Sequence, residues 1–135
     1  MSDGEKKYIL AIDPGRDKCG LAVLDLSGEI TEKKISPVGG MKESVREIVE
    51  KYQPSRIALG DGTGSEVIRE IVVAVSDAEI VLIKEKDTTL QARELAWRDC
   101  PVCGLWKIMP KLFWPTPTDI DAWAAVVIGR RALDG

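Results

Sequence analysis

The chain has 135 residues, of which 44% are hydrophobic and 30% are charged, and its net charge is −3. This length suits one ordinary domain with a buried core, and the composition excludes a disordered chain. No segment approaches the ~20 apolar residues of a membrane span, and the amino terminus lacks the apolar stretch of a signal peptide. The three cysteines are too few for a disulfide framework. We therefore expect a single cytoplasmic domain over residues 1–135, without membrane contact.

The first third of the chain predicts three antiparallel strands joined by short turns. Residues 8–13 form an apolar run without alternation, which is typical of a central strand covered on both faces. A turn at Pro14 and Gly15 leads into a second apolar run at 19–26. The third stretch, 29–36, is more polar, and its lysines favour an exposed sheet edge.

The rest of the chain alternates between helices and strands. Apolar residues recur at helical spacing from about 41 to 52, and the pattern then predicts a strand at 56–59, a helix at 65–75, a strand at 79–83 and helices at about 89–98 and 119–133. Strand-helix-strand units pair in parallel through right-handed crossovers. The sequence therefore predicts an α/β fold: a mixed five-stranded sheet, with three antiparallel strands and then two crossover strands, flanked by helices.

Three acidic residues stand where this topology could bring them to one edge of the sheet. Asp13 ends the first strand, Glu85 follows the fifth, and Asp121 lies near the start of the last helix. Ligands of open α/β sheets collect at the carboxyl ends of parallel strands. Three converging carboxylates would offer the oxygen ligands that Mg²⁺ prefers, and a pair of such ions can activate water against a phosphodiester. Because the chain has no histidine, histidine general-base catalysis and histidine-ligated zinc are excluded.

Each of the three acids also has an ordinary structural role open to it. Asp13 could cap its own turn by accepting hydrogen bonds from backbone amides. Glu85 could pair with Lys84 or Lys86 on the surface, and Asp121 could stabilise the start of its helix. The metal-binding interpretation therefore depends on all three acids meeting.

Three segments resemble the YqgF and RuvC resolvase-like families of the ribonuclease H superfamily, in the family order. Residues 12–15 (IDPG) followed by 20–23 (GLAV) resemble the first-strand motif. Glu85, three residues before the paired threonines at 88–89, is similar to the YqgF glutamate segment, and 120–125 (IDAWAA) is similar to the terminal Asp-x-x-Ala-Ala helix. Together these segments span nearly the whole chain.

The resemblance implies a ribonuclease-H-like fold and a Mg²⁺- or Mn²⁺-dependent endonuclease. Position by position, it makes Asp13, Glu85 and Asp121 the catalytic residues and metal ligands, with Asp119 as an assisting acid. Substrates of these families are branched DNA, as in Holliday junction resolution, or precursor ribosomal RNA. The expected partner is therefore nucleic acid, either branched DNA or structured RNA.

Other features leave a second function open. Lys84 and Lys86 flank the family glutamate where an acidic residue and an arginine are expected, so the local charge pattern differs. Residues 60–63 (GDGT) resemble the YqgF-like domain inside Tex transcription-accessory proteins, and members of that branch need not cut anything. In this loop Asp61 is either a turn former or an extra ligand, and Thr63 is a further candidate. The alternative is a catalytically silent module that binds nucleic acid or protein.

A third interpretation is an actin-like ATPase or sugar kinase. Its phosphate loop also has an aspartate and glycines after a first strand. Such enzymes clamp the nucleotide between two domains of this kind, whereas we expect one here, so this interpretation ranks below the other two.

Basic residues near the three acids predict contacts with a nucleic-acid backbone. Arg16 and Lys18, in the first turn, are placed to meet a scissile phosphate. Lys84, Lys86 and Arg93 could line a track for the backbone or could form an ordinary solvated surface. The net negative charge opposes nucleic-acid binding, but local patches matter more than the total.

The segment before the last helix carries most of the aromatic residues and two of the cysteines. The side chains between Trp97 and Trp114 predict core packing or a homodimer contact, with base stacking as the alternative. Cys100 and Cys103 supply half of the four ligands that a structural zinc site needs. Free thiols are therefore the expected state of these cysteines.

Overall fold

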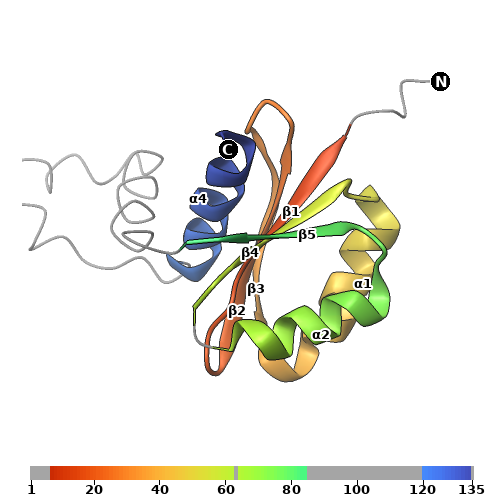
Figure 1. Ribbon diagram of the computed structural model, residues 1–135, viewed down its shortest axis with the longest axis vertical. Helices are drawn as coiled ribbons and strands as arrows, with labels where there is room; N and C mark the ends of the chain where they lie inside the picture. Colours follow the sequence, from red (N-terminus) through yellow and green to blue (C-terminus); the bar gives the residue numbers. More distant parts are fainter. Residues whose placement is uncertain (1–6, 63, 85–119, 135) are drawn as a thin grey trace, which may run out of the picture.

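A computed structural model describes residues 7–62, 64–84 and 120–134, except for the side chains of 120, 121 and 134. Figure 1 shows how its elements are arranged. Along the chain they are β1 (Tyr8–Asp13), β2 (Lys18–Asp25), β3 (Ile30–Pro37), the 3-10 helix η2 (Val38–Gly40), α1 (Met41–Tyr52), β4 (Arg56–Gly60), α2 (Ser65–Val75), β5 (Glu79–Ile83) and α4 (Ile120–Asp134).

The five strands form one mixed sheet in the order β3-β2-β1-β4-β5. β2 pairs antiparallel with both β1 and β3, whereas β4 pairs parallel with β1 and with β5. This arrangement confirms the predicted fold class, including the central place of the first strand and the edge position of the third. The helix expected at 89–98 lies outside the described residues.

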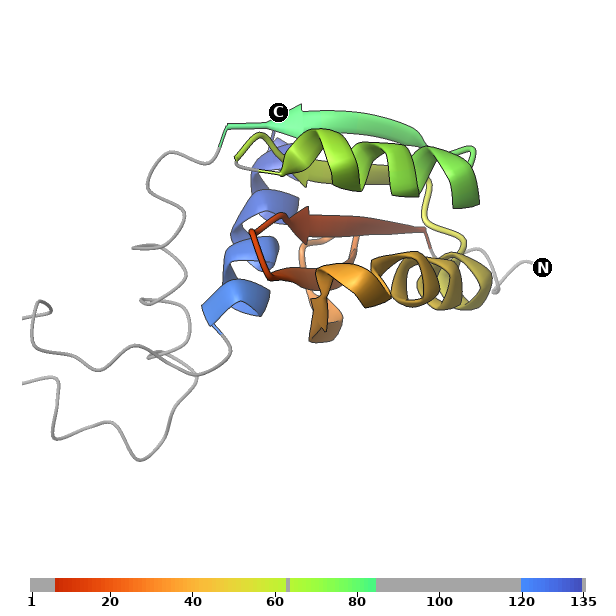
Figure 2. The same ribbon diagram turned by 90° about the horizontal axis from the view of Figure 1, so that it is seen from below.

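Helices cover both faces of the sheet (Figures 1 and 2). Successive side chains of a strand point to opposite faces, so Ile9 and Ala11 of β1 pack with α4, whereas Leu10 and Ile12 pack in the core formed with α1 and α2. All four of these side chains are fully buried. The apolar run without alternation at 8–13 is thus explained by a strand that is buried on both faces.

Small residues let α4 approach the sheet closely. The sheet presents Ala11, Ala22 and Ala58 to this helix. A Cβ atom added to Gly129 would lie 2.6 Å from Cδ1 of Leu24 and 3.0 Å from Cβ of Ala11. The distance between helix and sheet is therefore set by the absence of a side chain at position 129.

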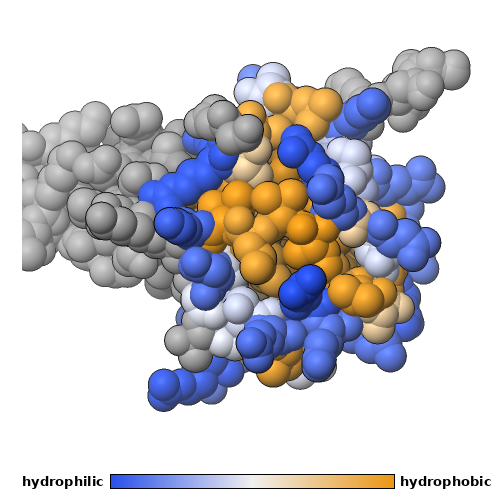
Figure 3. All heavy atoms as spheres, in the orientation of Figure 1, coloured by the Kyte–Doolittle hydropathy of each residue, from blue (hydrophilic) through white to orange (hydrophobic). Residues whose placement is uncertain are grey.

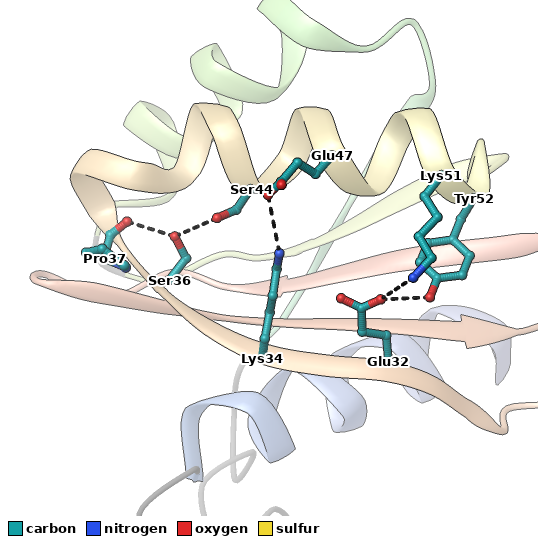
Figure 4. A network of polar contacts seen from close by, with 8 residues as sticks. All are labelled: Glu32, Lys34, Ser36, Pro37, Ser44, Glu47, Lys51 and Tyr52. Carbon is teal, nitrogen blue, oxygen red and sulfur yellow. Dashed lines mark hydrogen bonds and ion pairs between the residues drawn. The ribbon is translucent and has the colours of Figure 1, made fainter.

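Polar contacts fasten α1 to the edge strand β3 (Figure 4). The Tyr52 hydroxyl donates to Oε1 of Glu32 at 2.7 Å, and Nζ of Lys51 lies 3.5 Å from the same oxygen. The hydrogen bond from Tyr52 holds the pKa of Glu32 below its usual value, and the charge of Lys51 acts in the same direction. This end of α1 is thus tied to the sheet through an ionised glutamate.

The other end of α1 is held by hydroxyl groups. Ser44 Oγ donates to Ser36 Oγ at 3.0 Å, and Ser36 Oγ donates to the carbonyl oxygen of Pro37 at 3.0 Å. Ser36 is only 3% exposed, so these contacts satisfy a polar group that would be costly to bury alone. The sequence did not predict the 3-10 turn η2, which links β3 to α1.

None of the helices in the described part of the chain is both long and apolar enough to cross a membrane.

We expect the substitution Gly129→Ala to lower the free energy of unfolding by about 1 kcal/mol. Overpacking a core costs roughly 1–3 kcal/mol, and the better helix propensity of alanine offsets about 1 kcal/mol of this. Urea denaturation measures the difference. Gly39→Ala is the control, because a Cβ at Gly39 would meet nothing within 4 Å. An increase in stability for Gly129→Ala would contradict the proposed close packing.

We expect Tyr52→Phe to destabilise the protein by about 1 kcal/mol at neutral pH, because it removes a hydrogen bond to an ionised group. The lowered pKa of Glu32 means that its contribution is present above the unfolded pKa and is lost as the pH falls through the folded pKa. The difference between variant and wild type should therefore shrink in acid. Denaturation at pH 7 and at about pH 3.5 tests this expectation. Tyr8→Phe, whose hydroxyl makes no hydrogen bond to the described residues, should show no such trend.

Candidate functional site

The residues that follow the parallel strands lie together at one end of the sheet, which we call the carboxyl edge. Because β1, β4 and β5 run in parallel, their carboxyl ends lie on the same side. In Figures 1 and 2, α4 also begins on this side of the sheet. Asp13, the loop after β4 and Lys84 therefore share one edge with the amino end of the helix that contains Asp121.

A tight turn fixes the direction in which the chain leaves β1 after Asp13. A Cβ atom on Gly15 would collide with the carbonyl oxygen of Lys18, so only glycine fits at this position. The backbone N–H of Val38 donates to the carbonyl oxygen of Asp17 at 3.0 Å and anchors the turn to η2. Asp13 is half-buried at the base of this turn, and the side chains of Arg16 and Lys18 are exposed.

The loop between β4 and α2 lies against this turn. Gly64 adopts a left-handed conformation with φ of 85°, and a Cβ on it would lie 3.4 Å from the carbonyl oxygen of Gly15. The N–H of Asp61 donates to the carbonyl oxygen of Ile83 at 3.0 Å, which ties the loop to the end of β5. The exposed Asp61 is therefore held at the same edge as Asp13.

Two arginines position α4 against the sheet. Nη1 of Arg131 donates to the carbonyl oxygen of Lys84 at 2.7 Å, and Nε of Arg130 donates to that of Gly28 at 3.1 Å. Nearer the start of the helix, Nζ of Lys33 lies 4.7 Å from the centre of the Trp123 ring. These contacts fix the backbone of α4, and with it that of Asp121, relative to the strands. The sequence analysis missed the two arginines, and their place in the last turns of a helix was the only signal available.

The predicted site residues divide into two groups. Asp13, Asp61, Arg16, Lys18 and Lys84 lie at or beside the carboxyl edge of the parallel strands. The other candidates are Thr63, Glu85, Lys86, Arg93, Asp119 and the side chain of Asp121, which all lie outside the described residues, as does the proposed contact region 97–114. Within the described parts of the chain, no cluster of three metal-ligating side chains occurs. The three-carboxylate metal site therefore stays a prediction.

A cavity of about 400 Å³ lies elsewhere, between the turn that joins β2 to β3 and the last turns of α4. Leu26, Glu29, Arg130 and Leu133 are among its lining residues. The β2–β3 turn is at the opposite end of the sheet from Asp13. This cavity is thus separate from the candidate site.

We compared the chain with known protein families, sequences and structures. No family model matches the chain. The uncharacterized protein YdcI of Bacillus subtilis (strain 168) is 35% identical over 77 residues, which is 51% of this chain and 11% of that protein. The chain thus spans about a tenth of the length of the curated relative that it matches.

Two solved structures match over nearly the whole chain. Thermus thermophilus RuvC has a TM-score of 0.56 at 16% identity, covering 95% of this chain and 96% of that one. Thermus thermophilus RuvC in complex with a Holliday junction substrate has a TM-score of 0.57 at 15% identity, covering 91% and 90%. The chain therefore has a ribonuclease-H-like fold of the kind found in the RuvC resolvase.

We expect Arg131→Leu to loosen the end of β5 without unfolding the protein, because it removes a hydrogen bond between α4 and Lys84, the residue that follows this strand. Amide hydrogen exchange should become faster across residues 79–84, while the amides of β1 and β2 keep their protection. Arg46→Leu, at an exposed position of α1, is the matched control and should leave exchange in β5 unchanged. Unaltered exchange in Arg131→Leu would show that this contact does not hold the strand.

Proposed function

We propose that residues 1–135 act as one ribonuclease-H-like domain that hydrolyses phosphodiester bonds in branched DNA or in structured RNA such as precursor ribosomal RNA. In this proposal Asp13, Glu85 and Asp121 hold Mg²⁺ or Mn²⁺, and Asp119 assists them. The observation that supports it best is the position of Asp13, at the end of the central strand and on the edge where β4 and β5 end and α4 begins.

The acidic groups and the fold are chemically suited to this role. Carboxylate oxygens are the ligands that Mg²⁺ and Mn²⁺ prefer. When bound, such ions supply water activation and stabilisation of charge on the phosphate. Asp13 ends a strand that is hydrogen-bonded on both sides, which fixes the position of its backbone.

Positive charge beside Asp13 suits a phosphate backbone. Arg16 and Lys18 are exposed in the turn that follows this residue, and Lys84 is exposed after β5. Basic side chains in such positions would neutralise backbone charge close to the bond that is cut. The match to a RuvC structure that holds a Holliday junction supports nucleic acid as the substrate class.

The relationship to YdcI favours a second candidate function. A segment of only 77 residues is shared with a protein of which it makes up 11%. A domain of this size inside a much longer protein could serve as a catalytically silent module of the Tex type, binding nucleic acid or protein. Such a module would bind its partner without hydrolysing it.

We expect the purified protein to cleave a labelled four-way DNA junction or a structured RNA with Mn²⁺ or Mg²⁺, and to lose activity with a chelator. Asp13→Asn should lower the cleavage rate by at least ~100-fold, because one ligand oxygen is replaced by a neutral amide. Asp17→Asn removes the same charge from an exposed position in the same turn and serves as the control.

The outcome of this cleavage assay distinguishes the nuclease from the catalytically silent module. Metal-dependent cleavage that Asp13→Asn abolishes supports the nuclease. Equal cleavage by Asp13→Asn and wild type would contradict the assignment of Asp13. Binding of the junction without cleavage, under every metal condition, would instead support the silent module.

A further inference from the structure

The cavity at the end of the sheet opposite the carboxyl edge combines charged and apolar groups. Its walls are the turn that joins β2 to β3 and the last turns of α4, and its volume is about 400 Å³ (Figure 1). The lining residues are Leu26, Ser27, Gly28, Glu29, Arg130 and Leu133. Binding sites for small molecules measure roughly 300–1,000 Å³ and combine an apolar lining with a few polar groups. The size and lining of this cavity therefore suit a small organic ligand.

Hydrogen bonds within the β2–β3 turn shape one wall of the cavity. Oδ1 of Asp25 accepts hydrogen bonds from the backbone N–H of Ser27 at 2.9 Å, from the Ser27 hydroxyl, and from the backbone N–H of Glu29 at 3.1 Å. The N–H of Gly28 donates to the carbonyl oxygen of Asp25 at 3.0 Å, and Gly28 adopts a left-handed φ of 92°. A wall that is already ordered loses little conformational entropy when a ligand binds.

Arg130 holds hydrogen-bond donors ready on the other wall. Its Nε donates to the carbonyl oxygen of Gly28 at 3.1 Å, which orients the guanidinium relative to the turn. No second hydrogen bond or ion pair joins Arg130 to the described residues. The N–H groups on Nη1 and Nη2 are therefore available to a ligand, and their planar arrangement matches the two oxygens of a carboxylate.

Glu29 adds a negative charge to the same cavity. Its carboxylate makes no hydrogen bond or ion pair with the described residues, Arg130 included. A phosphate or another dianion would be attracted by Arg130 but repelled by Glu29. A ligand that carries one negative and one positive group would be attracted by both residues. The charges of the cavity therefore favour a zwitterion over a simple anion.

Two leucines supply the apolar part of the lining. Leu26 is 48% exposed in the turn, and Leu133 packs partly buried against the core beneath α4. At the top of Figure 3, where the β2–β3 turn lies, hydrophobic and hydrophilic side chains adjoin. An apolar group placed against Leu26 would remove apolar surface from water, which is favourable.

We infer that this cavity binds a free amino acid with an apolar side chain. The α-carboxylate of the ligand accepts hydrogen bonds from Nη1 and Nη2 of Arg130, and its ammonium group lies against Glu29. Its side chain contacts Leu26 and Leu133. This inference is independent of the proposed nuclease activity, because the β2–β3 turn and Asp13 lie at opposite ends of the sheet.

Titration of the full chain with leucine, followed by backbone amide signals in nuclear magnetic resonance spectra, tests the inference. The signals of residues 26–29 and 130–133 should shift and saturate, with a dissociation constant on the order of 1 mM for so small a ligand. Leucinamide lacks the carboxylate, N-acetyl-leucine lacks the ammonium group, and glycine lacks the apolar side chain. Each of these three analogues should bind at least ~10-fold more weakly than leucine.

Substitutions assign the two charged contacts. Arg130→Met removes the guanidinium but keeps an unbranched chain, and it should raise the dissociation constant of leucine by at least ~10-fold. Glu29→Gln should also raise it, and because Glu29 is exposed, this variant keeps the test open if Arg130→Met fails to fold. Arg46→Met and Glu43→Gln, at exposed positions of α1, are the matched controls.

Three results would overturn the inference. The first is the absence of saturable shifts at the cavity, and the second is binding of any of the three analogues as tightly as leucine. The third is leucine binding that Glu29→Gln leaves unchanged. Weaker binding by all three analogues and by the Glu29 variant, with both α1 controls like the wild type, supports the inference.

Discussion

Parallel pairing of β1, β4 and β5 is the constraint on which the rest of this structure depends. It brings together the carboxyl ends of β1, β4 and β5, which are remote along the sequence, at the carboxyl edge of the sheet. The turn after Asp13 and the loop containing Asp61 then lie against each other, and each has a glycine for a reason of its own: a Cβ on Gly15 would collide with the carbonyl oxygen of Lys18, and Gly64 has a left-handed conformation. Asp13 and Asp61, the two candidate acids whose side chains the structure describes, both lie at that edge.

The helix α4 is the second element that positions the candidate site, because it contains Asp121 and begins at the carboxyl edge of the sheet. Gly129 and the alanines of the sheet let α4 pack close to the strands. Arg131 hydrogen-bonds to the backbone of Lys84, the residue after β5. The polar links between α1 and β3 belong to the opposite face and stabilise the sheet away from the candidate site. The candidate site thus lies at the carboxyl ends of the parallel strands, whereas both faces of the sheet are covered by packed helices.

The sequence predicted the strands and helices well because their periodicity reports burial directly. The run at 8–13 indicated a strand covered on both faces, and the lysines at 33 and 34 indicated an edge; both predictions are confirmed. The apolar run of β5 did not reveal its edge position, because a short apolar strand has the same pattern whether or not a neighbour covers it. The contact of Arg131 and the need for glycine at 129 arise from tertiary packing, which local patterns do not encode. For the candidate site, the structure shows the setting of Asp13 and Asp61, and the three-carboxylate site stays a prediction.

The central claim is that Asp13, Glu85 and Asp121 meet around divalent metal. Paramagnetic broadening of backbone amide signals by Mn²⁺ in nuclear magnetic resonance spectra tests it most directly, since the effect falls steeply with distance from the ion. The account predicts broadening at low Mn²⁺ concentration that is concentrated at the amides of Asp13, Gly15, residues 61–62 and 84–85 and at the start of α4. Broadening that instead spreads over the exposed acids of α1, or that persists unchanged in Asp13→Asn, would contradict it.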